Sequence, residues 1–120
     1  MAKYLVLLRG SGAPSTLSPQ EMQKVIQRYM TWSDDLREAG RVLGAEKLRF
    51  GEGRVLRGDA GKMAVTDGPY AESKEIVGGF WLIEAGSYDE MLKILSTHPH
   101  LESPGSIEVR EVEERPYTRA

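Results

Sequence analysis

The stretch that decides the fold is Val65–Ala85, which reads V-T-D-G-P-Y-A-E-S-K-E-I-V-G-G-F-W-L-I-E-A. It joins an Asp-Gly-Pro turn, a charged connector and a Gly-Gly pair that opens an apolar strand. Glycine and proline control backbone shape more strongly than other residues, so a chain that bends twice beside a buried strand tends to build a concave surface. The strand Gly79–Ala85 is apolar on both faces, which predicts that both faces of its sheet are covered.

The sequence on either side of this stretch alternates between strand and helix patterns. A serine followed three residues later by glutamate predicts two helix starts, at Ser18 and at Ser87. The first helix is expected to end at Gly40, and the second to end before Pro99. Short runs of apolar or alternating residues predict strands at Lys3–Arg9, Arg41–Phe50, Arg54–Arg57, Lys62–Thr66, Gly79–Ala85 and Ile107–Val112.

The resulting order is strand, helix, strand, hairpin, strand, helix, strand. This βαββαβ order with an inserted β-hairpin predicts a single α+β domain over residues 1–120. We expect a ferredoxin-like antiparallel sheet with both helices on one face. The other face would carry apolar side chains that no third helix covers. A second copy of the chain is the simplest cover, so we expect a homodimer with its sheets face to face.

Composition excludes several classes of protein. Sixteen basic and eighteen acidic residues give a net charge of −2, so the chain lacks the electrostatic footprint of a nucleic-acid-binding protein. The absence of cysteine removes disulfides, thiolate nucleophiles and cysteine-ligated zinc. The apolar run Tyr4–Leu8 is shorter than a signal-peptide core or a membrane span. We therefore expect a cytoplasmic protein that has no membrane partner.

Two histidines, His98 and His100, flank Pro99 at the end of the second predicted helix. His98 is a candidate general base, because the pKa of histidine lies near neutral pH. The alternative is that His98 is a cation that interacts favourably with the helix dipole at the C-terminus. Two histidines alone make a weak metal site, so no metal is predicted. The glycine pairs do not form a phosphate-binding loop, so no nucleotide cofactor is predicted either.

Asp67 ends a predicted strand just before a Gly-Pro turn. Its carboxylate suits the first position of that turn, where it would accept hydrogen bonds from local backbone amides. The alternative is a general acid or base at the mouth of a barrel. Tyr70, directly after the turn, could present its hydroxyl group to a ligand. Trp32 and Trp81 are large aromatic residues that fill a core or an interface in most proteins, and Trp32 could also cap a pocket.

Arg110 shares one face of the last predicted strand with Glu108. A guanidinium group on the barrel side of the sheet would suit a ligand that carries a carboxylate. The alternative is a cross-strand salt bridge with Arg9 or Glu84, which would satisfy the charges without any ligand.

These pieces together resemble the YCII-related family, in its DGPF branch. The matching residues are Asp67–Glu72, Lys74–Glu75, Gly78–Glu84, Tyr4–Leu8, Glu38–Gly40 and Ile107–Arg110. The resemblance implies a dimeric α/β barrel of ferredoxin-like subunits, similar in shape to muconolactone isomerases. It also implies an association with lyase or dehydrochlorinase chemistry, and with domains linked to extracytoplasmic sigma factors.

The resemblance further implies an active site with a histidine on the first helix and an aspartate before a proline after the second. This chain departs from that pattern. By spacing, Tyr29 falls near the first of these positions, and His98 stands before Pro99 at the second. The histidine–aspartate pair is therefore not reproduced.

The first functional hypothesis is a small dimer that binds a polar or carboxylated organic molecule and carries out cofactor-free lyase or isomerase chemistry. His98 would act as the base, Asp67 or Tyr70 as the acid, and Arg110 as the anion clamp. Further ligand contacts are expected from Tyr29, Trp32 and Trp81. The second hypothesis is a non-catalytic interaction or sensory module linked to transcription, in which the hairpin Arg54–Thr66 is the contact surface.

Overall fold

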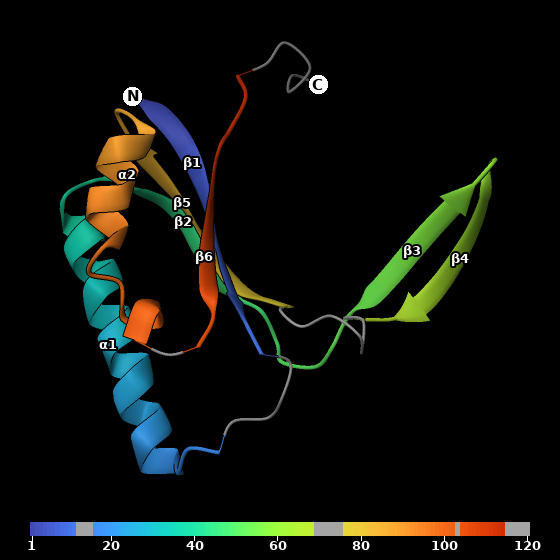
Figure 1. Cartoon of the computed structure of the whole chain (residues 1–120), viewed down its shortest axis with the longest axis horizontal. Coiled ribbons are helices and arrows are strands. Elements are labelled where there is room, and N and C mark those ends of the chain that lie inside the picture. Colours follow the sequence, from blue (N-terminus) through green and yellow to red (C-terminus); the bar gives the residue numbers. More distant parts are fainter. Residues whose placement is uncertain (12–15, 69–75, 103, 115–120) are drawn as a thin grey trace.

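The computed structural model describes residues 1–11, 16–68, 76–102 and 104–114. They form a four-stranded sheet with two α-helices on one face and a separate two-stranded hairpin (Figure 1). The elements are β1 (Ala2–Gly10), α1 (Pro19–Glu38), β2 (Val42–Lys47), β3 (Arg54–Asp59), β4 (Lys62–Asp67), β5 (Ile76–Ala85), α2 (Tyr88–Leu95), the 3₁₀-helix η1 (Pro99–Glu102) and β6 (Ser106–Glu111).

The strand order in the main sheet is β2-β5-β1-β6, and every neighbouring pair is antiparallel. The predicted α+β class, with two helices and an antiparallel sheet, is confirmed. The strand order is consistent with the ferredoxin-like arrangement. The β3–β4 hairpin lies between β2 and β5 in the sequence and pairs only with itself among the described strands.

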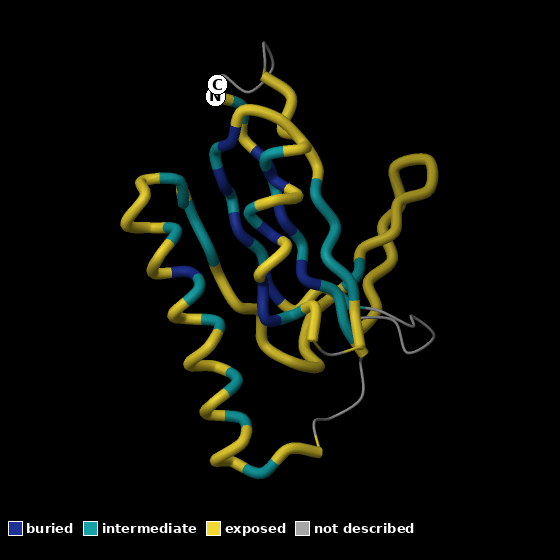
Figure 2. Tube along the Cα trace, turned by 60° about the vertical axis from the view of Figure 1, so that its left-hand side comes forward, coloured by how far each residue is buried: buried dark blue, intermediate teal, exposed yellow. Residues whose placement is uncertain are grey.

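The core lies between the sheet and the helices. Strand side chains alternate between the two faces of a sheet, so every second residue of β1 and β5 enters this layer. Figure 2 shows the buried residues concentrated along these strands and α2. The buried apolar residues are Tyr4, Val6, Leu8, Trp81, Ile83, Ala85, Met91 and Leu95.

The opposite side of the sheet, which we call the open face, has no described helix over it (Figure 1). At its centre are four half-buried apolar side chains that alternate with the core residues. They are Leu5, Leu7, Phe80 and Leu82. The prediction that both faces of the sheet are apolar is therefore confirmed, and one face lacks a cover within the described part of the chain.

Helix α1 begins as the sequence predicts. The Ser18 hydroxyl accepts from the backbone N–H of Glu21, and the Glu21 carboxylate accepts from the backbone N–H of Ser18. Met22, Val25, Ile26, Tyr29 and Leu36 recur at helical spacing, which predicts one inward stripe on α1. The prediction is wrong at Ile26, which is 44% exposed, whereas Trp32 packs against the core. The N-terminal turns of α1 extend past the sheet, where Met22 and Val25 are only half-buried (Figure 1).

Helix α2 ends at Leu95, well before Pro99, and Pro99 then begins the 3₁₀-helix η1, which the sequence pattern did not predict. At Ser87 only one of the two hydrogen bonds of a capping box forms. Ser87 accepts from the backbone N–H of Glu90, but the Glu90 carboxylate accepts from Gly86 and pairs with Arg41. Neither described α-helix is long and apolar enough to cross a bilayer.

The hairpin turn is tighter than the predicted four-residue turn. Strands β3 and β4 continue to Asp59 and Lys62, leaving Ala60 and Gly61 at the tip with φ angles of 50° and 85°. Two positive φ angles in a two-residue loop are typical of a type I′ turn, which matches the twist of the flanking strands.

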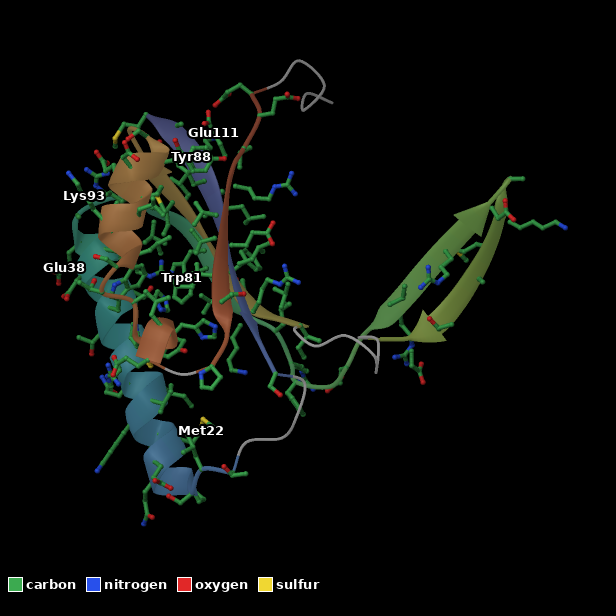
Figure 3. The ribbon with its side chains drawn as sticks, viewed as in Figure 1. Met22, Glu38, Trp81, Tyr88, Lys93 and Glu111 are labelled. Atoms are coloured by element: carbon green, nitrogen blue, oxygen red, sulfur yellow. The ribbon has the colours of Figure 1, made fainter. Side chains whose placement is uncertain are left out.

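A buried polar contact joins α1 to the sheet. Ser33 is 8% exposed, and its hydroxyl oxygen accepts from the indole N–H of Trp81 at 3.1 Å. Figure 3 shows Trp81 in the layer between the sheet and α1. Since a small residue lets the helix approach closely and its oxygen satisfies the indole, Ser33 serves both packing and hydrogen bonding.

We predict that Ser33→Ala lowers the free energy of unfolding by about 1–3 kcal/mol, because the buried indole N–H of Trp81 loses its acceptor. Urea denaturation would measure this. In a Trp81→Phe background the same substitution should cost less, since no donor remains to be satisfied. Equal costs in the two backgrounds would contradict the assignment.

Candidate functional site

The turn after α2 brings two histidines against α1. The hydroxyl of Tyr29, on α1, lies 2.8 Å from Nδ1 of His100, and Nε2 of His100 lies 2.8 Å from the backbone carbonyl oxygen of Arg9. A carbonyl only accepts, so Nε2 of His100 carries a proton. In the tautomer that is protonated at Nε2 alone, Nδ1 accepts from the Tyr29 hydroxyl. The three groups therefore form one directed hydrogen-bond chain.

Gly105 makes room for this chain. A Cβ atom at this position would lie 2.6 Å from the Arg9 carbonyl oxygen and 3.0 Å from Nε2 of His100. The φ angle of Gly105 is 149°, in the region that side chains disfavour. Any other residue here would push the His100 ring away from its acceptor.

His98 lies deeper, with 2% of its surface exposed. Its Nδ1 accepts from the backbone N–H of His100 at 3.0 Å, so the proton of the neutral ring is on Nε2. Nε2 is buried and has no hydrogen-bond partner among the residues that the structure describes. Burial, helped by the nearby His100, lowers the pKa of His98 to about 4. His98 is therefore neutral at pH 7, which argues against the helix-end cation.

Aromatic rings surround His98. Their centroids lie 4.4 Å from the imidazole for Trp32, 5.0 Å for Trp81 and 5.3 Å for Tyr29. The indole N–H of Trp32 donates outward to the hydroxyl of Thr97 at 3.1 Å. The aromatic rings around His98 offer its Nε2–H only π faces, which are weak acceptors compared with an oxygen atom.

The rim of the cluster is charged. An ion pair between Arg28 and Glu102 links α1 to η1, and both side chains are more than half exposed. Burial raises the pKa of Tyr29, while the charge of Arg28 acts in the opposite direction. The Tyr29 hydroxyl is therefore protonated at neutral pH. Within the described residues, no group of three or more His, Cys, Asp or Glu side chains could hold a metal ion.

The structure gathers four of the predicted site residues and separates two others. Tyr29, Trp32 and Trp81 contact His98. Asp67 ends β4 in the hairpin, with its side chain 92% exposed and 3.6 Å from Arg54, far from η1 (Figure 1). No local backbone amide is described as donating to its carboxylate.

Arg110 lies on the open face, where it is in register with Leu5, on the other side of the sheet from His98. Its neighbour Glu108 makes a salt bridge with Arg9 at 3.0 Å, as the cross-strand alternative predicts. Tyr70 lies outside the described residues.

Sequence reasoning missed the part played by His100. The sequence shows a His-Pro-His motif, but the 3₁₀ turn that aims His100 at Tyr29 has no apolar periodicity to reveal it. The Pro104-Gly105 pair was the available signal, since a Pro-Gly dipeptide marks a turn in the backbone.

Comparison with known proteins places this cluster inside a recognised domain. The sequence pattern of the YCII-related domain matches residues 2–115. The chain is also 35% identical over 101 residues to an uncharacterised protein from Rhizobium meliloti (strain 1021), which covers 80% of this chain and 79% of that protein. The domain match includes every residue of the Tyr29–His98–His100 cluster.

We predict that acid destabilises the fold through His98. Its pKa is about 4 when folded and 6.5 in the reference state, so between these pH values the unfolded chain binds a proton that the folded chain excludes. The free energy of unfolding should fall as the pH is lowered through this range, by about 3 kcal/mol at most.

The control is His98→Asn, whose amide oxygen can still accept from the backbone N–H of His100 but does not titrate. Carboxylates such as Glu21 and Glu90 also have lowered pKa values and add their own acid dependence, so the comparison is between the two proteins. The pH slope from 6.5 to 4 should be smaller in the variant. Identical slopes, measured by chemical denaturation at each pH, would refute the role of His98.

Proposed function

The chain belongs to the YCII-related family, and we propose that it binds a small polar organic molecule at the Tyr29–His98–His100 cluster. The observation that carries this proposal is the buried Nε2–H of His98, which has no acceptor among the described residues. A buried donor left without a partner costs about 1–3 kcal/mol. A carbonyl or carboxyl oxygen of a ligand would supply the missing acceptor.

Trp32 is the proposed entrance. Its ring is half-buried, lies nearest to His98, and has one described hydrogen bond, to the exposed Thr97. Rotation of the indole would break that hydrogen bond and the ring contacts with His98 and Trp81, and would open a path to Nε2 of His98. The Arg28–Glu102 pair at the rim offers a cation for a ligand that carries a carboxylate.

The cluster is also suited to proton transfer. In the proposed step, the Tyr29 oxygen removes a proton from the carbon beside a ligand carbonyl, while the Tyr29 proton passes to Nδ1 of His100. A C–H bond breaks, an N–H bond forms, and the carbonyl becomes an enolate. The Nε2–H of His98 donates to the enolate oxygen, and the Arg9 carbonyl supports the His100 imidazolium.

This assignment changes the roles expected from sequence. His98 is a hydrogen-bond donor rather than the base, because its acceptor nitrogen is already occupied by the backbone N–H of His100. Return of the proton to another carbon gives an isomerase, and loss of a leaving group gives a lyase. Neither reaction needs a cofactor, and neither uses Asp67 or Arg110.

We further propose that the molecule is a homodimer of the barrel type, in the DGPF branch, and that it resides in the cytoplasm. The apolar centre of the open face supports the dimer, since water would otherwise contact Leu5, Leu7, Phe80 and Leu82. Dimers that close on themselves use the same surface on both copies, and a central sheet face is such a surface.

A thermal-shift screen of small keto acids, hydroxy acids and lactones should give stabilising ligands whose effect is lost in His98→Asn. For such a ligand, exchange of the proton beside its carbonyl in heavy water, followed by NMR, should be at least about 100-fold slower with Tyr29→Phe than with the unaltered protein.

Tyr88→Phe is the matched control, because it removes a hydroxyl group that bonds to the backbone of Glu111 away from the cluster. Its exchange rate should match that of the unaltered protein. Ligands that stabilise His98→Asn equally well would place the site elsewhere. Binding without proton exchange would retain the binding proposal and refute the chemistry.

The dimer has a separate prediction. Leu7→Glu, at the centre of the open face, should shift the protein to monomers in sedimentation velocity, because a charge would be buried without a partner. Leu92 lies on α2 and is 60% exposed, so Leu92→Glu should leave the assembly unchanged. A monomeric parent protein at micromolar concentration would refute the dimer.

A further inference from the structure

The β3–β4 hairpin carries an apolar face of its own. Leu56 is in register with Val65, and Gly58 is in register with Met63, so these positions share one side of the hairpin. We call Leu56, Met63 and Val65 the hairpin's apolar face. Their exposed fractions are 59%, 65% and 52%. The opposite side of the hairpin carries smaller or polar residues such as Ala64 and Thr66.

An isolated β-hairpin has little stability of its own in water. Two strands alone are marginally stable, and a third strand or a packing partner is normally needed. The hairpin stands away from the main sheet in both views (Figures 1 and 2). The radius of gyration, 16.5 Å, exceeds the roughly 14 Å expected of a compact chain of this length. A partner that covers the hairpin would explain both features.

We propose that the hairpin is an exchanged arm, whose apolar face packs on the open face of a second copy of this chain. The inference rests on the proposed dimer and goes beyond it, because it names the second surface of the interface. By two-fold symmetry each subunit gives one arm and receives one.

The direction of the hairpin supports a second copy as the occupant. It projects on the side of the sheet away from the helices, which is the side of the open face (Figure 1). Its base is held in place, since the backbone N–H of Gly68 donates to Gly53 at 3.0 Å. A Cβ atom at Gly68 would lie 2.8 Å from the Val55 side chain, so this crossing is closely packed.

The charges of the two surfaces fit the same occupant. Arg54 and Asp67 pair at the base of the hairpin, and Arg9 pairs with Glu108 on the open face. Each surface therefore presents an apolar centre beside an ion pair, and the open face also carries Arg110. The net charge of −2 per chain adds little repulsion between copies.

The test compares two neighbouring residues of β4 that lie on opposite faces of the hairpin. Met63→Glu should raise the dimer dissociation constant at least about tenfold, because it places a charge in the apolar contact. Ala64→Glu adds the same charge on the other face and should change it less than about threefold. Sedimentation equilibrium measures both constants, and circular dichroism checks folding. If Met63→Glu is misfolded, Leu56→Ser is used in its place and should also raise the dimer dissociation constant.

A second readout locates the contact. The chain lacks cysteine, so Met63→Cys accepts a single nitroxide label. In a mixed dimer with ¹⁵N-labelled parent chains, the label should broaden the amide signals of Leu7 and Leu82 in the partner copy. If Met63→Glu leaves the dissociation constant unchanged and the label at Met63→Cys leaves the open-face signals unchanged, the exchanged arm is refuted and the dimer proposal stands. A monomeric parent protein refutes both.

Discussion

The antiparallel pairing of β1 with β5 is the constraint on which the rest of the molecule depends. It places Val6 beside Trp81 and Tyr4 beside Ile83, so the buried residues of both strands enter one layer. A slip of one residue would reverse every side chain of β1. Gly79 is part of this arrangement, since a Cβ there would lie 3.0 Å from the carbonyl oxygen of Glu46 on β2. The same register positions Trp81, which packs against His98, and forms the apolar centre of the open face.

The cluster shows how burial and hydrogen bonding assign different tasks to two histidines that are two residues apart. The backbone N–H of His100 occupies one nitrogen of His98, and its aromatic surroundings exclude charge. His100 instead lies between a hydroxyl donor and a carbonyl acceptor. One imidazole is therefore held neutral, while the other links a hydroxyl group of α1 to the backbone of β1.

Local signals in the sequence predicted much of the fold and less of the site. The Ser18 cap and the alternation in β1, β5 and β6 are determined by neighbouring residues, so they could be predicted. The inward position of Trp32 in place of Ile26 depends on where the sheet ends beneath α1, which is a tertiary fact. The role of His100 depends on a 3₁₀ turn and on the carbonyl of Arg9, which is 91 residues earlier in the chain.

The two tryptophans, Trp32 and Trp81, are the only ones in the chain, and both rings lie within about 5 Å of His98. Imidazole protonation and nearby polar groups change the emission of an indole. The tryptophan fluorescence of the protein, excited at wavelengths that tyrosine does not absorb, therefore originates beside His98. A ligand that binds beside His98 can therefore be detected by tryptophan fluorescence, without a dye or an added label.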